Sequence, residues 1–217
     1  MIKKRRQGMK VVKIFVPVIM FLFIAHSSYA DQKPNIVGIY SEMAGKEFHF
    51  DGKTVEIVEF LSFYCGHCYH LEKSVPVIKG NFPKKTKWKI IPIYWGKGSP
   101  KPGEAYLIAE EEGKGPQMKA ALFNAIFVDK RDIGNITVLE DLGMKVGLGF
   151  DFSRKLRAGE KADEAGKALD MARSYGIQET PTLIIAGNLK VSPGLLNNDV
   201  ELVRDNVIVI LKSLFTK

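Results

Sequence analysis

Cys65 and Cys68 are the only cysteines among the 217 residues, and two residues separate them. A disulfide between them would close so short a loop that it would stabilise the fold very little. A Cys-x-x-Cys pair is typical instead of thiol–disulfide exchange, in which a thiolate attacks the sulfur of a disulfide. We therefore expect these two side chains to form a reversible, redox-active disulfide.

The pair lies where a strand pattern gives way to a helix pattern. Residues 54–63 are rich in Val, Ile and Phe, as in a buried central strand. From Cys65 onward, apolar residues recur at helical spacing, namely Cys68, Leu71, Val75 and Ile78. Cys65 would thus begin a helix, where free N–H groups and the helix dipole stabilise an anion. His67, as a cation or a hydrogen-bond donor, would further favour the thiolate, and Cys68 would lie one turn deeper.

Other uses of the pair fit the residues less well. A zinc site would have to recruit both cysteines together with His67 and His70 from one short helical segment, and no second ligand pair exists. Covalent c-type haem attachment needs His directly after the second cysteine, where Tyr69 stands. An inert structural disulfide is a further alternative. We expect no cofactor and no bound metal.

Glu59 is a second candidate, because a carboxylate in a buried strand usually has a reason to be there. It could accept or relay a proton for the deeper thiol of Cys68, balanced by Lys87 or Lys89 on the next predicted strand. The alternative is a residue at the end of the strand that faces water or is held in an ion pair. The sequence leaves both open.

Thr180 and Pro181 form a third candidate, directly before a predicted strand at residues 182–186. A proline in this position is an edge or turn device. Only about 5–6% of X-Pro bonds are cis in folded proteins. On local evidence alone, the Thr180-Pro181 bond is therefore expected to be trans.

Residues 1–30 have the order of a secretory signal: a basic start, an apolar run and small residues before position 31. The apolar run is shorter than the roughly 20 residues of a membrane span, although retention as an anchor is an alternative. This segment holds six basic and no acidic residues, so the remaining chain is nearly balanced at 26 basic against 24 acidic. The net charge of +8 is therefore no argument for nucleic-acid binding.

The rest of the chain predicts an α/β protein with a helical insertion. Strand, helix and strand over residues 54–94 indicate a right-handed βαβ unit. Residues 97–160 show short helical patterns and no strand, with Thr137 and Asp151 as predicted helix caps. We predict one domain from residues 31–96 and 161–217 and an inserted helical subdomain at 97–160. The remaining predicted elements are a short strand at 47–50, a hairpin at 182–192 and helices at 160–175 and 199–215.

The stretch from Glu59 to Glu72 closely resembles the active site of the DsbA family of bacterial thiol:disulfide oxidoreductases. The resemblance implies a thioredoxin fold interrupted by a helical domain. It implies that Cys65 is the exposed nucleophile, Cys68 its buried partner and Glu59 the buried acid. It also implies that the Thr180-Pro181 peptide bond is cis, with its loop facing the disulfide and binding substrate backbone.

Two residues depart from the pattern of the best-known oxidants in this family. Gly66 stands where those proteins carry proline, and Thr180 stands where valine is common. Both resemble isomerases and reductases, so a disulfide reductase or isomerase is one alternative. A non-catalytic thiol chaperone or metal carrier is another.

We expect an exported, periplasmic oxidase that is a monomer and binds no nucleic acid. Its expected partners are exported proteins with reduced cysteines. A DsbB-like membrane quinone reductase, implied by the resemblance, would reoxidise it.

Overall fold

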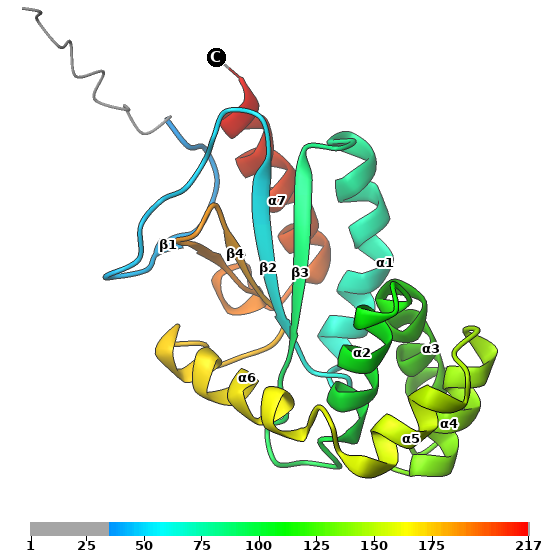
Figure 1. Ribbon diagram of the computed structural model, residues 1–217. Helices are drawn as coiled ribbons and strands as arrows, with labels where there is room; N and C mark the ends of the chain where they lie inside the picture. The colour runs from blue at the N-terminus through cyan, green and yellow to red at the C-terminus, as the bar shows by residue number, and fades with distance from the viewer. Residues whose placement is uncertain (1–34, 217) are drawn as a thin grey trace, which may run out of the picture. The chain divides into compact units, whose positions relative to one another are not determined.

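The computed structural model describes residues 35–216, so the predicted signal at residues 1–30 lies outside the described part. Five strands form one sheet in the order β1-β5-β4-β2-β3 (Figure 1). Central strand β2 pairs in parallel with β3 and antiparallel with β4, and β5 pairs antiparallel with β4 and β1. The strand bounds are β1 Ser41–Glu42, β2 Val55–Leu61, β3 Thr86–Pro92, β4 Thr182–Ile185 and β5 Leu189–Val191.

Helices cover both faces of the sheet, as the apolar run in β2 requires. Helices α1 (Gly66–Asn81) and α7 (Val200–Phe215) pack on one face, over a core that includes Ile57. Helix α6 (Ala162–Ser174) packs on the other face, against Phe60 (Figure 1). The predicted α/β class is therefore confirmed.

Four helices lie in the chain between β3 and α6: α2 (Lys101–Glu111), α3 (Gly115–Phe127), α4 (Ile136–Lys145) and α5 (Phe150–Ala158). They share one apolar core that also takes in Leu61, Phe63 and Cys68 from the sheet domain. The buried cysteine is thus a member of the core of these helices.

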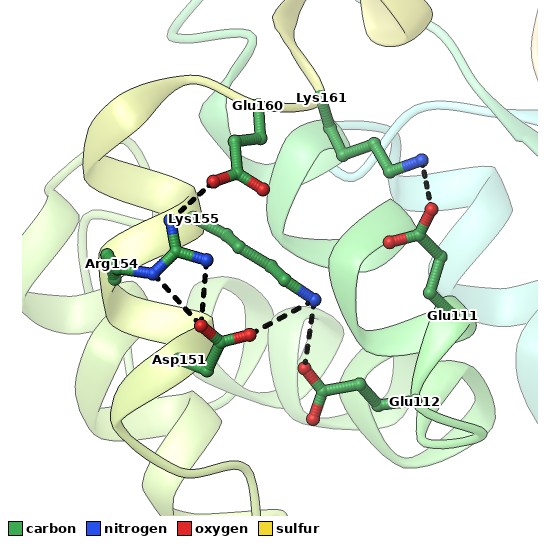
Figure 2. Close-up of polar contacts among 7 residues, drawn as sticks. All are labelled: Glu111, Glu112, Asp151, Arg154, Lys155, Glu160 and Lys161. Atoms are coloured by element: carbon green, nitrogen blue, oxygen red, sulfur yellow. Dashed lines mark hydrogen bonds and ion pairs between the residues drawn. The ribbon is translucent and has the colours of Figure 1, made fainter.

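Charged side chains join the ends of α2, α5 and α6 (Figure 2). Arg154 of α5 pairs with Asp151 at 2.8 Å and with Glu160 at 2.6 Å. Lys155 lies 3.6 Å from Glu112, which follows α2. Pairs as exposed as these stabilise by about 0–1 kcal/mol each, so they orient the helix ends more than they hold the fold.

The strand predicted at residues 47–50 is wrong, and the edge strand is β1 instead. Residue Met43, just after β1, donates its N–H to the Asn188 carbonyl at 3.0 Å. His49 donates its N–H to the Ala186 carbonyl at 2.8 Å, while Phe50 packs against Phe215. The aromatic side chains of residues 47–50 therefore pack against the core around α7, and this segment forms no strand.

Two predicted caps are also wrong. Asn135 caps α4, because its side chain accepts the Thr137 N–H at 2.8 Å, so the helix begins before the predicted cap at Thr137. Gly149 precedes α5, and Asp151 lies inside the first turn, where it pairs with Arg154. In both cases the predicted cap lies two residues after the observed one. Where two nearby residues could cap a helix, only the backbone conformation shows which of them does so.

Within residues 35–216, none of the helices has both the length and the apolar character needed to cross a bilayer.

The packing of α4 on α5 yields a stability prediction. A Cβ added at buried Gly143 would clash with the ring of Phe152, which is itself buried. We expect Gly143→Ala to lower the free energy of unfolding by about 1–3 kcal/mol, the usual cost of overpacking. Urea unfolding followed by circular dichroism measures the change.

The matched control is Gly166→Ala in α6, where an added Cβ would meet nothing within 4 Å. This exposed helical position should gain about 0.5–1 kcal/mol from the substitution. Equal effects at the two glycines would contradict the packing described for α4 and α5.

Candidate active site

Cys65 is the N-cap residue of α1, placed there by the end of β2 and the turn that follows. Its backbone is extended, with φ −96° and ψ 119°, and its N–H donates to the Ser62 carbonyl at 3.0 Å. Its sulfur accepts the N–H of Cys68 at 3.3 Å. A sulfur in the N-cap position thus occupies the place where a helix binds an anion.

The neighbouring residue Tyr64 anchors this turn to the loop after β3. Its hydroxyl oxygen accepts the N–H of Ser99 at 3.1 Å. The ring of Tyr64 lies against Gly98, whose φ of +84° and close approach leave no space for a side chain. The Tyr64 N–H also donates to Ser62 Oγ at 3.3 Å, so the residue before the reactive cysteine is fixed at both its backbone and its side chain.

The loop before β4 lies against the same sulfur. Because β4 runs antiparallel to β2, with Thr182 opposite Phe60, this loop reaches the end of β2. The Cys65 thiol donates to the Thr180 carbonyl at 3.0 Å. The Thr180-Pro181 bond is cis, so the trans geometry expected on local evidence is wrong and the geometry implied by the resemblance is present.

The two cysteines differ sharply in acidity. The pKa of Cys65 is lowered from 9.0 to about 6, mainly by the hydrogen bond with the Cys68 side chain. Burial opposes this change, and the backbone N–H groups of Cys68 and His67 and a hydrogen bond from the Thr180 side chain add to it. Near neutral pH, Cys65 is therefore mostly a thiolate.

Cys68 is fully buried in the core shared with the inserted helices. Burial raises its pKa well above 9.0, and the hydrogen bond with Cys65 and the charge on that neighbour raise it further. Both cysteines are unpaired, so the structure is the reduced form. One sulfur is thus activated and accessible, and the other is protonated and sheltered.

His67 and Glu59 differ in their exposure to solvent. The His67 side chain is exposed, and the contribution of this residue to the lowered pKa of Cys65 comes from its backbone N–H. Glu59 is fully buried in β2, opposite Ile90 and Leu183 of the flanking strands. Burial raises the pKa of Glu59 to about 7, and its charge raises the pKa of Cys68.

The prediction that Lys87 or Lys89 balances the charge of Glu59 is wrong. Lys87 and Lys89 of β3 are exposed, whereas Lys119 of α3 brings its Nζ to 3.8 Å from Glu59 Oε2. The same Nζ lies 2.5 Å from Oε2 of Glu72 in α1. Sequence reasoning missed both residues, although a lysine next to Met118 on the apolar face of a helix was a possible signal.

Within residues 35–216, no three His, Cys, Asp or Glu side chains gather in a way that could hold a metal ion.

A titration tests the asymmetry of the two thiols. In the reduced protein, we expect the ultraviolet absorbance of the Cys65 thiolate to appear with a midpoint near pH 6. Cys65→Ser should remove this transition. Cys68→Ala should move it upward, because this substitution removes the side-chain hydrogen bond that makes the largest contribution to the low pKa. A midpoint near 9 in the unaltered protein would contradict the geometry.

The same pKa predicts how stability depends on pH. Because the folded pKa of Cys65 lies below its ordinary value of 9.0, ionisation favours the folded reduced protein. We expect the free energy of unfolding of the reduced form to rise between about pH 6 and 9, and this gain to vanish as the pH falls through 6. The disulfide form, unfolded by urea in parallel without reductant, should lack this rise.

Comparison with known proteins gives consistent matches. A family model described as DSBA-like thioredoxin domain matches residues 56–205. The thiol:disulfide interchange protein DsbA of Azotobacter vinelandii is 27% identical over 143 residues, which cover 64% of this chain and 66% of that protein. The DsbA of Haemophilus influenzae is 25% identical, over 70% of this chain and 75% of that protein. The chain thus spans about two thirds to three quarters of these relatives.

Solved structures match over more of their length. A variant of Pseudomonas aeruginosa DsbA superimposes with a TM-score of 0.65 at 20% identity, covering 79% of this chain and 94% of that one. The oxidoreductase DsbA of Xylella fastidiosa gives 0.64 at 19% identity, covering 80% and 94%. At this identity the likeness shows the fold alone.

Proposed function

This chain belongs to the family of DSBA-like thioredoxin domains, and from that premise we propose that it is a thiol:disulfide oxidoreductase that introduces disulfides into other proteins. The observation that carries the proposal is the Cys65 sulfur. It lies at the start of a helix, opposite the Thr180-Pro181 loop, with a pKa of about 6 beside a buried, protonated thiol.

The low pKa supports the oxidising direction. A stabilised thiolate favours the reduced protein, and so makes the disulfide form a better oxidant. With a pKa of about 6, ionisation at pH 7 favours the reduced protein by about 1.4 kcal/mol, or about 30 mV for a two-electron couple. The reduction potentials of thioredoxin and of the strongest oxidants differ by about 150 mV. The low pKa of Cys65 therefore accounts for part of this difference and makes the potential more oxidising.

The reaction begins on the oxidised protein. A substrate thiolate attacks Sγ of Cys65, the Cys65–Cys68 bond breaks, and Cys68 leaves with the electron pair and takes up a proton. The second substrate thiolate then attacks the substrate sulfur of the mixed disulfide, and Cys65 leaves as a thiolate. Two substrate thiols are oxidised to a disulfide, and the protein disulfide is reduced to two thiols.

Attack at Cys65 follows from access, since Cys68 has no exposed surface. The Thr180-Pro181 loop binds the substrate backbone beside the sulfur, and Glu59 adjusts the charge around Cys68. His67 supplies its backbone N–H to the thiolate, and its exposed side chain faces incoming substrate. Residues 97–160 form an inserted subdomain that closes over the buried side of the cysteine pair.

The substrates are exported proteins with reduced cysteines, and a DsbB-like membrane quinone reductase restores the disulfide. The protein acts in the periplasm as a monomer. The location and the partners are supported by the signal-like residues 1–30 and by the relatives named DsbA.

A reductase or isomerase that uses the same pair is the second candidate, favoured by Gly66 and Thr180. Measurement of the reduction potential against glutathione decides between the two. We expect a value nearer about −120 than about −270 mV, the range from DsbA to thioredoxin. A potential at or below the thioredoxin end would reject the oxidase.

A refolding assay tests the assignment of the nucleophile. Cys65→Ser should abolish oxidative refolding of a reduced, disulfide-containing substrate. Cys68→Ser cannot form the active-site disulfide, so it should also fail to oxidise the reduced substrate. Mixed with the oxidised substrate instead, its Cys65 thiolate should attack a substrate disulfide, expel one substrate thiolate and accumulate as a mixed disulfide, because no second protein sulfur can displace the substrate. Refolding activity that survives Cys65→Ser, or stoichiometric metal binding without thiol exchange, would contradict the proposal in favour of a chaperone or carrier.

A further inference from the structure

Lys119 is a buried cation supplied to the active site by an inserted helix. It lies in α3 between Met118 and Leu122, and only 6% of the residue is exposed. A lysine this buried requires an acidic partner, because an unpaired charge in the core is very costly. Its Nζ has two carboxylates in reach, Glu72 at 2.5 Å and Glu59 at 3.8 Å.

The two carboxylates differ in their access to solvent. Glu72 lies four residues after Cys68 in α1, hence on the same face of the helix, and 24% of its side chain is exposed. Glu59 has no exposed surface, and neither of its carboxylate oxygens has a hydrogen-bond partner among residues 35–216. Lys119 thus stands between a buried acid and an acid that reaches water.

Other charged groups act on Glu59 from the elements around it. Lys79 of α1 lowers its pKa, although less than Lys119 does, and Glu72 raises it. From α2, the Tyr106 hydroxyl donates to Glu110 at 3.1 Å, and the charge of Glu59 contributes to the raised pKa of that phenol. Among these groups, the Lys119 ammonium is the cation nearest to Glu59, and the closer contact draws it toward Glu72.

We propose that Lys119 is a positioning residue for the buried half of the reaction. It shares its ammonium between Glu59 and Glu72, and so sets the protonation state of Glu59 and the charge that Cys68 meets when it becomes a leaving group. The proposal deepens the oxidoreductase function and rests on it.

The proton balance of the reaction gives this sharing a role. When the Cys65–Cys68 bond breaks, Cys68 keeps the electron pair and needs one proton. A protonated Glu59 can give up its proton toward that side of the core, and the carboxylate that results is stabilised by Lys119. A proton from solvent, entering on the side of Glu72, then restores Glu59. No oxidant or reductant other than the substrate thiols and the protein disulfide takes part.

The arrangement predicts opposite effects of two substitutions that touch neither cysteine. Lys119→Met removes the nearest cation, so Glu59 should hold its proton to a higher pH. Glu72→Gln removes the competing anion and frees the ammonium to approach Glu59, so Glu59 should lose its proton at a lower pH. If the ion pair only held α3 against α1, neither variant would move the pH profile of the rate at which thiols reduce the protein disulfide, which should otherwise follow the Glu59 midpoint.

The test is a carbon-13 NMR titration of the reduced protein, labelled in its glutamate carboxyl groups. The Glu59 signal is assigned as the one lost in Glu59→Gln, and in the unaltered protein it should titrate near pH 7. We expect Lys119→Met to raise that midpoint by about one unit or more, the usual effect of a close opposite charge. We expect Glu72→Gln to lower the Glu59 midpoint. Lys119→Arg, which keeps the positive charge, should leave this midpoint close to that of the unaltered protein.

Lys73→Met is the matched control, because Lys73 is an exposed α1 lysine that lies over the ring of Tyr69. It should leave the Glu59 midpoint in place. Midpoint shifts of the same sign in Lys119→Met and Glu72→Gln, or none, would overturn the proposal. If Lys119→Met does not fold, the Glu72→Gln shift decides alone: a fall supports the proposal, and an unchanged or raised midpoint overturns it.

The outcome is separate from that of the oxidase assignment. The titration depends on the reduced protein alone and not on the direction of electron flow. Opposite shifts together with a potential at the thioredoxin end would retain the role of Lys119 and reject the oxidase. An oxidising potential without the shifts would do the reverse.

Discussion

A sulfur at the start of a helix accepts the N–H of Cys68, and the side chains of Cys68 and Thr180 form hydrogen bonds with it. This small set of contacts makes Cys65 an anion near neutral pH. It requires β2 to end where α1 begins, and β4 to return antiparallel so that its leading loop meets the same point. The sheet and its two layers of helices therefore bring the turn between β2 and α1 and the loop before β4 together at the Cys65 sulfur.

The second constraint is the burial of Cys68. Exchange with substrate needs one sulfur in reach and the other out of reach, and the inserted helices complete the enclosure, since Cys68 belongs to the same core as Ile108 and Leu122. The same helices also bury an ionisable side chain. Glu59 has no access to water, and its nearest cation comes from α3 rather than from the sheet.

Local pattern predicted the features that depend on neighbouring residues. The strand ending near Leu61, the helix from Cys65 and the strand at 182–185 follow from period and composition, and the structure has them. The family resemblance added the cis geometry at Pro181, which local frequencies argued against. Features set by distant partners were missed. The edge strand formed at Ser41–Glu42, where pairing with β5 decides, and residues 47–50 packed on α7 instead.

The partner of Glu59 shows the same limit most clearly. The neighbouring parallel strand β3 carries Lys87 and Lys89, yet both side chains point outward to water. Lys119 reaches Glu59 only because α3 folds back over α1, a contact between segments far apart in the chain. A lysine among the apolar residues of α3 was visible in the sequence, but its target was not.

The position of Lys119 bears on how such proteins can be recombined. An insertion within a conserved scaffold is usually regarded as a module that sets partner choice and can be grafted or trimmed without touching the chemistry. Here the module contributes part of the wall around Cys68 and the ammonium beside Glu59. A chimera whose replacement helices lack a lysine at the position of Lys119 would remove the cation beside Glu59 even though both cysteines were kept.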